Sequence, residues 1–158
     1  MLDNLAENIV DYKKPRPEGI TYIIDKFQGF DKENFELIAD FIDMVKIYGA
    51  YPLLISEDNL IRRIDFYHKK IVLVSTRSTL TEYALRENVF EKFVEESKTA
   101  GFDIIKISEN NVNIYSEEKK KLVKVLDYHN LKLNLKIGKK DPRRQLSLDD
   151  TIKKINEP

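Results

Sequence analysis

The chain has 158 residues, of which 42% are hydrophobic and 34% charged, and this combination fits one globular domain with a substantial core. Its 27 Lys and Arg residues balance 27 Asp and Glu residues, so no global field would draw it onto nucleic acid or an anionic membrane. The lack of cysteine rules out disulfides and thiolate metal sites and fits a reducing compartment.

Residues 1–18 do not resemble a secretory signal, because Asp3, Glu7 and Asp11 interrupt the apolar stretch that such a signal needs. No run in the chain approaches the roughly 20 apolar residues of a membrane span. We therefore expect an N-terminal arm over residues 1–18, a single domain over residues 19–158, a cytoplasmic location and no membrane partner.

Two strand–helix units are predicted at the start of the domain. Residues 20–27 read as a buried strand, and Asp31 can cap the helix that follows it. Residues 43–48 make the second strand, and Ser56 or Asp58 can cap the second helix. The apolar positions that fall on one face of these helices are Phe35, Ile38, Phe41 and Ile42 in the first, and Leu60, Ile61, Ile64 and Tyr67 in the second.

Three more strands follow, at residues 70–76, 102–108 and 131–137. Between them, helical sequence runs from Thr79 to near Gly101, and another helix starts at Ser116. Ser147 can cap a last short helix. Five strands that alternate with helices predict a parallel α/β arrangement, either an open doubly wound sheet or a piece of a (β/α)₈ barrel.

Each predicted strand ends in or is followed by a cation: Lys26, Lys46, Arg77, Lys106 and Lys136, with Lys139 just beyond the last one. Parallel strands gather their carboxyl ends at one rim, where ligands bind in such folds, so these cations predict a small anionic ligand. A second interpretation stays open for Lys106 and Lys136. The fifth strand alternates apolar and polar residues, as a half-solvated strand does, so that both lysines would simply face water.

Three other features favour structural interpretations. Thr79 and Glu82 have the spacing of a capping box. His68 and His129 are predicted at helix C-termini, where an imidazole meets the helix dipole. Acidic neighbours interrupt the basic runs at residues 119–121 and 139–144, which argues against a nucleic-acid partner.

The blocks KPRPEGITYIIDK, FIDMVK, STLTE, GFDIIKIS and IGKKD, in this order and spacing, resemble the phosphosulfolactate synthase family over roughly residues 12–150. The resemblance implies a (β/α)₈ barrel and a magnesium-dependent lyase that joins sulfite to phosphoenolpyruvate on a route to coenzyme M. It also implies relatives among plant heat-stress-associated proteins, which share the fold.

The resemblance implies a role for each candidate residue. Lys139 would be the catalytic acid/base. Asp25 and Glu82 would hold Mg²⁺. The cations that would bind phosphate, carboxylate or sulfite are Arg16, Lys26, Lys46, Arg77, Lys106 and Lys136.

Departures from the family pattern make the rim more basic. Lys106 and Lys136 stand where the family has acids, which would repel magnesium, and Arg77-Ser78 replaces a Gly-Gly pair. The sequence predicts five βα units in 158 residues, whereas a complete barrel has eight units and about 250 residues. We therefore expect a partial barrel with open edges, through which copies could pair. The alternative function is therefore a non-catalytic partial barrel that binds a small phosphorylated or sulfonated anion or serves as an assembly partner.

Overall fold

The computed structural model describes residues 13–16, 18–26, 31–108, 114, 116–138 and 141–156. Its centre is a sheet of five parallel strands in the order β1-β2-β3-β4-β5. The strands are β1 (Tyr22–Asp25), β2 (Met44–Ile47), β3 (Leu73–Ser75), β4 (Ile104–Ser108) and β5 (Lys132–Lys136). Because neighbours in the sheet are neighbours in the chain, the order never reverses. This excludes the doubly wound alternative and confirms the (β/α) repeat of a partial TIM barrel.

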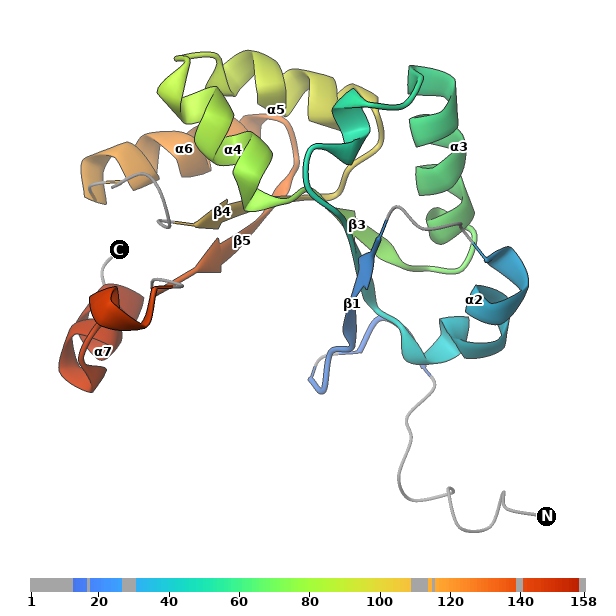
Figure 1. The fold of residues 1–158 in the computed structure, drawn as a ribbon, viewed down its shortest axis with the longest axis horizontal. Helices are drawn as coiled ribbons and strands as arrows, with labels where there is room; N and C mark the ends of the chain where they lie inside the picture. The colour runs from blue at the N-terminus through green and yellow to red at the C-terminus, as the bar shows by residue number, and fades with distance from the viewer. Residues whose placement is uncertain are drawn as a thin grey trace, which may run out of the picture.

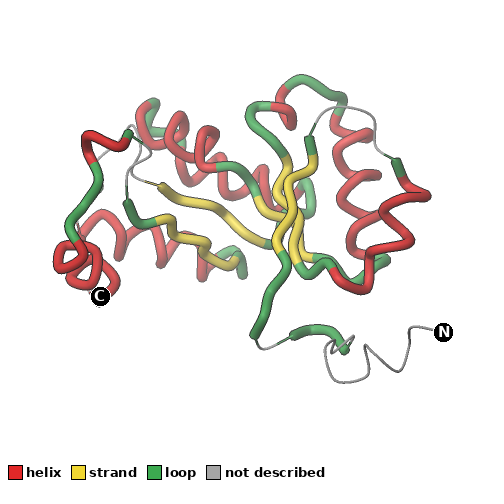
Figure 2. The backbone as a smooth tube through the Cα atoms, turned by 60° about the horizontal axis from the view of Figure 1, so that its bottom comes forward, coloured by secondary structure: helices red, strands yellow, loops and turns green. Residues whose placement is uncertain are grey.

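Among the described residues, five helices connect successive strands and lie along the outer side of the curved sheet, and a sixth, α7, follows the last strand (Figure 1). They are α2 (Lys32–Ile38), α3 (Glu57–His68), α4 (Ser78–Arg86), α5 (Phe90–Thr99), α6 (Ser116–Tyr128) and α7 (Leu148–Asn156), with short 3-10 turns at Ala39–Phe41, Tyr51–Leu53 and Pro142–Arg144. Figure 2 shows the strands side by side between the helices. Within the described part of the chain, no helix is long and apolar enough to cross a membrane.

The register of the strands separates the two faces of the sheet. Ile24 lies beside Lys46, and Lys46 beside Ser75, so these three side chains share a face. Val45 and Val74 alternate with them, point to the helices and are fully buried. We call the face opposite the helices the concave face; its strand residues are Tyr22, Ile24, Met44, Lys46, Leu73, Ser75, Ile104, Lys106, Ser108, Lys132, Asn134 and Lys136.

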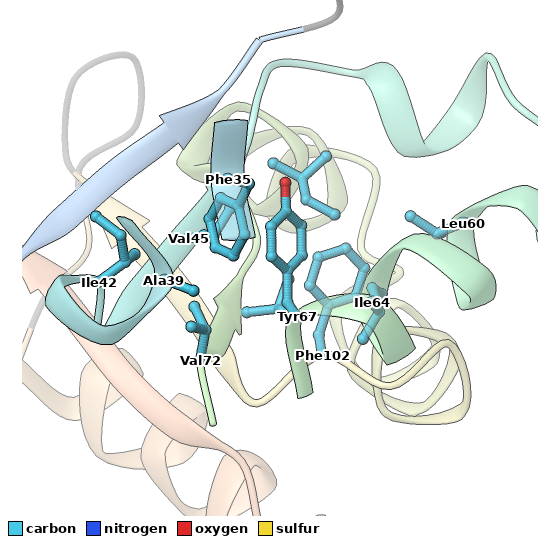
Figure 3. Packing of buried hydrophobic residues seen from close by; sticks show 11 residues of the cluster. Phe35, Ala39, Ile42, Val45, Leu60, Ile64, Tyr67, Val72 and Phe102 are labelled. Carbon is cyan, nitrogen blue, oxygen red and sulfur yellow. The ribbon is translucent and has the colours of Figure 1, made fainter. Parts of the chain in front are cut away.

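Two apolar clusters join the helices to the convex side. In the first, the ring of Phe35 meets those of Phe66 and Tyr67 edge-on, with centroids 5.6 and 5.1 Å apart. Figure 3 shows Tyr67 standing among Val45, Ile64 and other members of this cluster. The second cluster packs α5 and α6 against β4 and contains Phe90, Val94, Ile105, Ile107, Ile114, Leu122, Leu126 and Leu131.

The predicted strands are confirmed, with their ends shortened by up to three residues. Asp31 caps α2 by accepting a bond from the Asn34 amide, and Ser147 accepts one from the Asp150 amide. Ser56 precedes α3 without a capping bond from its side chain.

Two predictions about the region after β3 were wrong. The expected single helix from Thr79 to Gly101 is two helices, because Asn88 adopts a left-handed conformation with φ of 58°. The capping box is also absent: α4 begins one residue earlier, after Arg77, and Glu82 is directed elsewhere.

Candidate anion-binding site

Two lysines and a tyrosine form the centre of the concave face. The Nζ atoms of Lys46 and Lys106 lie 5.1 and 5.2 Å from the centroid of the Tyr22 ring. Both ammonium groups therefore contact the same aromatic ring from neighbouring parts of the sheet, at cation–π distance. Burial raises the pKa of the Tyr22 hydroxyl, although its interaction with Ser75 opposes that rise. The ring stays neutral and provides an apolar floor between two positive charges.

The backbone around Lys106 is fixed by side chains from the preceding unit. The Lys106 amide donates to Thr76 Oγ1 at 3.1 Å, and its carbonyl accepts from Thr81 Oγ1 at 2.9 Å. Thr76 and Thr81 are almost completely buried. Lys46 is held differently, between the fully buried Val45 and Ile47 of a central strand. Both lysines thus project from rigid parts of the sheet.

A third cation lies at the carboxyl ends of the strands. The guanidinium carbon of Arg77 lies 4.2 Å from the centroid of the Tyr48 ring, so the two groups are stacked. Arg77 directly precedes α4, and Tyr48 directly follows β2. Stacking on the ring fixes the plane of the guanidinium group, and therefore the directions in which its N–H groups can donate hydrogen bonds.

The other predicted rim cations occupy less defined positions. Lys26 is exposed one residue beyond β1. Lys136 is half-buried at the end of β5 and lies beside Ser108 in register. The predicted catalytic Lys139 lies outside the described residues.

Arg16 is not brought to this rim. Its Nε and Nη2 donate to the two carboxylate oxygens of Asp43 at 2.9 and 2.8 Å, just before β2 begins. The Thr21 amide also donates to Asp43, at 2.7 Å. Arg16 therefore ties the N-terminal arm to the end of the sheet opposite the rim.

Asp25 points to the convex side, away from Lys46. Its carboxylate oxygens accept from Arg63 Nη2 at 2.9 Å and from the Tyr67 hydroxyl at 2.9 Å, while Arg63 Nε lies 2.6 Å from one of them. Burial together with the nearby carboxylate raises the pKa of Tyr67. The Tyr51 hydroxyl accepts from Arg63 Nη1 at 3.0 Å. Asp25 thus belongs to a buried network that holds α3 against β1.

Glu82 lies beside β4, where its Oε1 accepts from the Ser108 hydroxyl at 2.6 Å. Asp25 and Glu82 therefore engage different partners on different elements. Among the described residues, no three Asp, Glu or His side chains are grouped so as to hold a metal ion. Because magnesium prefers several oxygen ligands, the described part of the concave face, rich in ammonium groups, does not fit that ion.

Tyr22 and Tyr48 were not predicted as site residues, although both lie under the cations. The signal was present for Tyr22, since alternation along residues 22–26 puts it on the same face as Lys46 once the register is known. Tyr48 follows β2 and could not be placed from periodicity. With these two rings the cations form two cation–π groups, one of Lys46, Lys106 and Tyr22 and the other of Arg77 and Tyr48.

The sequence profile of the (2R)-phospho-3-sulfolactate synthase (ComA) family matches residues 10–158. The chain belongs to this family. Phosphosulfolactate synthase of Methanocaldococcus jannaschii is 31% identical over 142 residues, which are 87% of the chain and 57% of that relative. Phosphosulfolactate synthase of Methanothermobacter thermautotrophicus is 31% identical over 147 residues, or 90% of the chain and 57% of the relative.

A plant protein is similar as well. Protein HEAT-STRESS-ASSOCIATED 32 of Arabidopsis thaliana is 29% identical over 130 residues, which cover 78% of the chain and 45% of the plant protein. The chain therefore spans 57% or less of the length of these relatives. The family membership predicted from the motif blocks is confirmed.

Proposed function

We propose that the concave face binds a small phosphorylated or sulfonated anion and that the chain is related by descent to the lyase that joins sulfite to phosphoenolpyruvate. The observation that supports this best is the group formed by Lys46, Lys106 and Tyr22, together with Arg77 stacked on Tyr48. Positive groups held on rigid strands at the carboxyl ends of a parallel sheet suit a ligand with two or three negative charges.

The addition of sulfite to phosphoenolpyruvate builds up negative charge that positive groups of the protein can stabilise. The sulfur lone pair forms a bond to the methylene carbon of phosphoenolpyruvate, and the electrons of the double bond move toward the carboxylate to form an enediolate. A general acid then delivers a proton to the carbon that carries the phosphate, which completes the addition. In this proposal Lys46 and Lys106 stabilise the enediolate, Arg77 binds phosphate or sulfite, and Lys139 delivers the proton.

Magnesium dependence is part of the proposal only through the family resemblance. Asp25 and Glu82, the acids that the resemblance assigns to magnesium, accept hydrogen bonds from Tyr67 and Ser108. A second candidate function follows from the same observation: a face that binds anions through ammonium groups without carrying out the addition.

One pair of experiments separates the two functions. The enzymatic form predicts that purified protein with sulfite, phosphoenolpyruvate and magnesium consumes both substrates and yields phosphosulfolactate, detected by mass spectrometry. A K46M variant should lose this activity, whereas K92M, which alters an exposed lysine on α5, should keep it. No consumption by folded wild-type protein would contradict the enzymatic form.

The binding form predicts a rise in melting temperature with phosphate, sulfate, sulfite or phosphoenolpyruvate, greater than with chloride at the same ionic strength. Stabilisation without turnover would favour the non-catalytic function. If none of these anions stabilised the protein, both functions would be contradicted.

A further inference from the structure

An apolar groove with a cationic border lies at the β5 edge of the molecule, on the helix side of the sheet. It encloses about 530 Å³ between α6, β5 and α7. Its apolar lining comprises Ile107, Leu122, Val123, Leu133 and Leu135, and its charged border comprises Glu117, Lys119, Lys120, Lys121, Lys124 and Lys154. Five lysines against one glutamate give this border a positive excess.

An unburied apolar stripe lies next to the groove. Leu148, Ile152 and Ile155 fall on one side of α7 and expose 76%, 48% and 61% of their surface. No residue of α7 is buried in the structure. Lys154, from the same helix, forms part of the groove border. One edge of the chain therefore carries both an open apolar groove and a helix whose apolar side is uncovered.

The charges of the two surfaces are complementary. The first turn of α7 carries Asp149 and Asp150 and its last turn Lys153 and Lys154, whereas the groove border carries Glu117 at the start of α6 and Lys120, Lys121 and Lys124 farther along it. A helix that placed its apolar stripe in the groove antiparallel to α6 would bring its acids near these lysines and its own lysines near Glu117. Because each chain carries both the groove and a matching helix, two copies related by a two-fold axis would each cover the groove of the other.

We propose that the chain forms a symmetric dimer in which α7 of each copy lies in the groove between α6 and β5 of the other. The occupant of the groove is thus a second copy of this chain, and the contact is independent of the concave face. It buries Ile152 and Val123, which the single chain leaves 48% and 36% exposed.

Sedimentation equilibrium of the full chain tests the assembly first. We expect a concentration-dependent mass that approaches twice the 18.6 kDa of one chain. Separate substitutions I152D and V123D should each raise the dimer dissociation constant by about tenfold or more, since each places a carboxylate in an apolar contact. The control L37D alters a residue that is 78% exposed on α2 and should leave the constant unchanged.

Disulfide trapping tests which surfaces meet. Because the chain has no native cysteine, V123C and I152C each introduce a single thiol. An oxidised mixture of the two variants should form a mixed disulfide between chains, whereas V123C mixed with L37C should not. Circular dichroism of each variant establishes that it is folded.

Two results would overturn the proposal. The first is a monomeric mass over the whole concentration range. If I152D then also lowered the melting temperature of the monomer, α7 would pack into the groove of its own chain. The second is a dimer that survives both I152D and V123D and gives no mixed disulfide, which would place the contact elsewhere.

Discussion

Because successive side chains of a strand point to opposite faces of the sheet, ionisable residues that are adjacent in sequence have different partners. Asp25 and Lys26 are adjacent in sequence, yet Asp25 is buried against Arg63 on the helix side, whereas Lys26 is exposed beyond the strand. The same alternation puts Lys46 and Lys106 above Tyr22. A residue that matches a family motif can therefore serve stability, as Asp25 does here.

The pair formed by Arg16 and Asp43 gives a prediction for stability against pH. Burial alone would raise the pKa of Asp43, but the hydrogen bonds from Arg16 and Thr21 outweigh it and hold the pKa below its ordinary value of 3.8. A carboxyl group with a lowered pKa stabilises the fold above pH 3.8, and this contribution is lost as the pH falls through its folded-state pKa.

We therefore expect R16L to lower the free energy of unfolding by about 1–3 kcal/mol at neutral pH. The difference from wild type should shrink below pH 3.8. Urea titrations at several pH values measure it. The matched control is R86L, which removes an exposed pair with Glu87 and should have little effect. A difference that stays constant down to the lowest pH would contradict this account of Asp43.

At the scale of elements, four helices end in the same way. After α3, α4, α5 and α6, a residue with positive φ is followed by an apolar residue whose amide bonds back to the last turn. The residues with positive φ are Ile71, Asn88, Gly101 and Asn130, and the apolar residues that follow them are Val72, Val89, Phe102 and Leu131. The repeated ending turns each chain segment back toward the sheet or toward the next helix.

Ile71 is the unusual member of this set, because a β-branched residue fits a φ of 54° poorly. Its side chain is 67% exposed, so little packing would be lost on replacement. We predict that I71G raises the free energy of unfolding by about 1 kcal/mol. Chemical denaturation measures this, with N88G as a comparison that should change stability less, since asparagine already tolerates positive φ. A destabilised I71G would show that the Ile71 side chain contributes packing after all.

Much of the fold could be predicted from periodicity, because the first four strands are short and rich in apolar residues, and the fifth alternates apolar and polar residues. The break between α4 and α5 could not, since the signal is a single Asn88 in an otherwise helical pattern. The rim cations Lys46 and Arg77 were predicted from their positions at or just after the carboxyl ends of strands. Their partners Tyr22 and Tyr48 depend on register and rotamer, which one sequence does not fix.

At the scale of the molecule, the sheet has a protected centre and two edges. Val45, Val74 and Ile105 are fully buried, whereas Ile24 on the edge strand β1 is 45% exposed. We predict that the amides of residues 44–47 exchange with solvent deuterium more slowly than those of residues 22–25. Hydrogen exchange followed by mass spectrometry measures both segments in one experiment. Equal protection would mean that the edge strand β1 is covered in solution.

In our proposal, the concave face binds a small anion through Lys46 and Lys106 around Tyr22. Isothermal titration of phosphoenolpyruvate into wild type, K46M/K106M and the control K92M/K98M, which alters two exposed lysines of α5, tests it most directly, since all three proteins can be compared at one ionic strength. We predict saturable binding to wild type and to the control, and a dissociation constant about tenfold or more higher for K46M/K106M. Equal affinity in all three proteins, or an equal loss in both double variants, would contradict the claim.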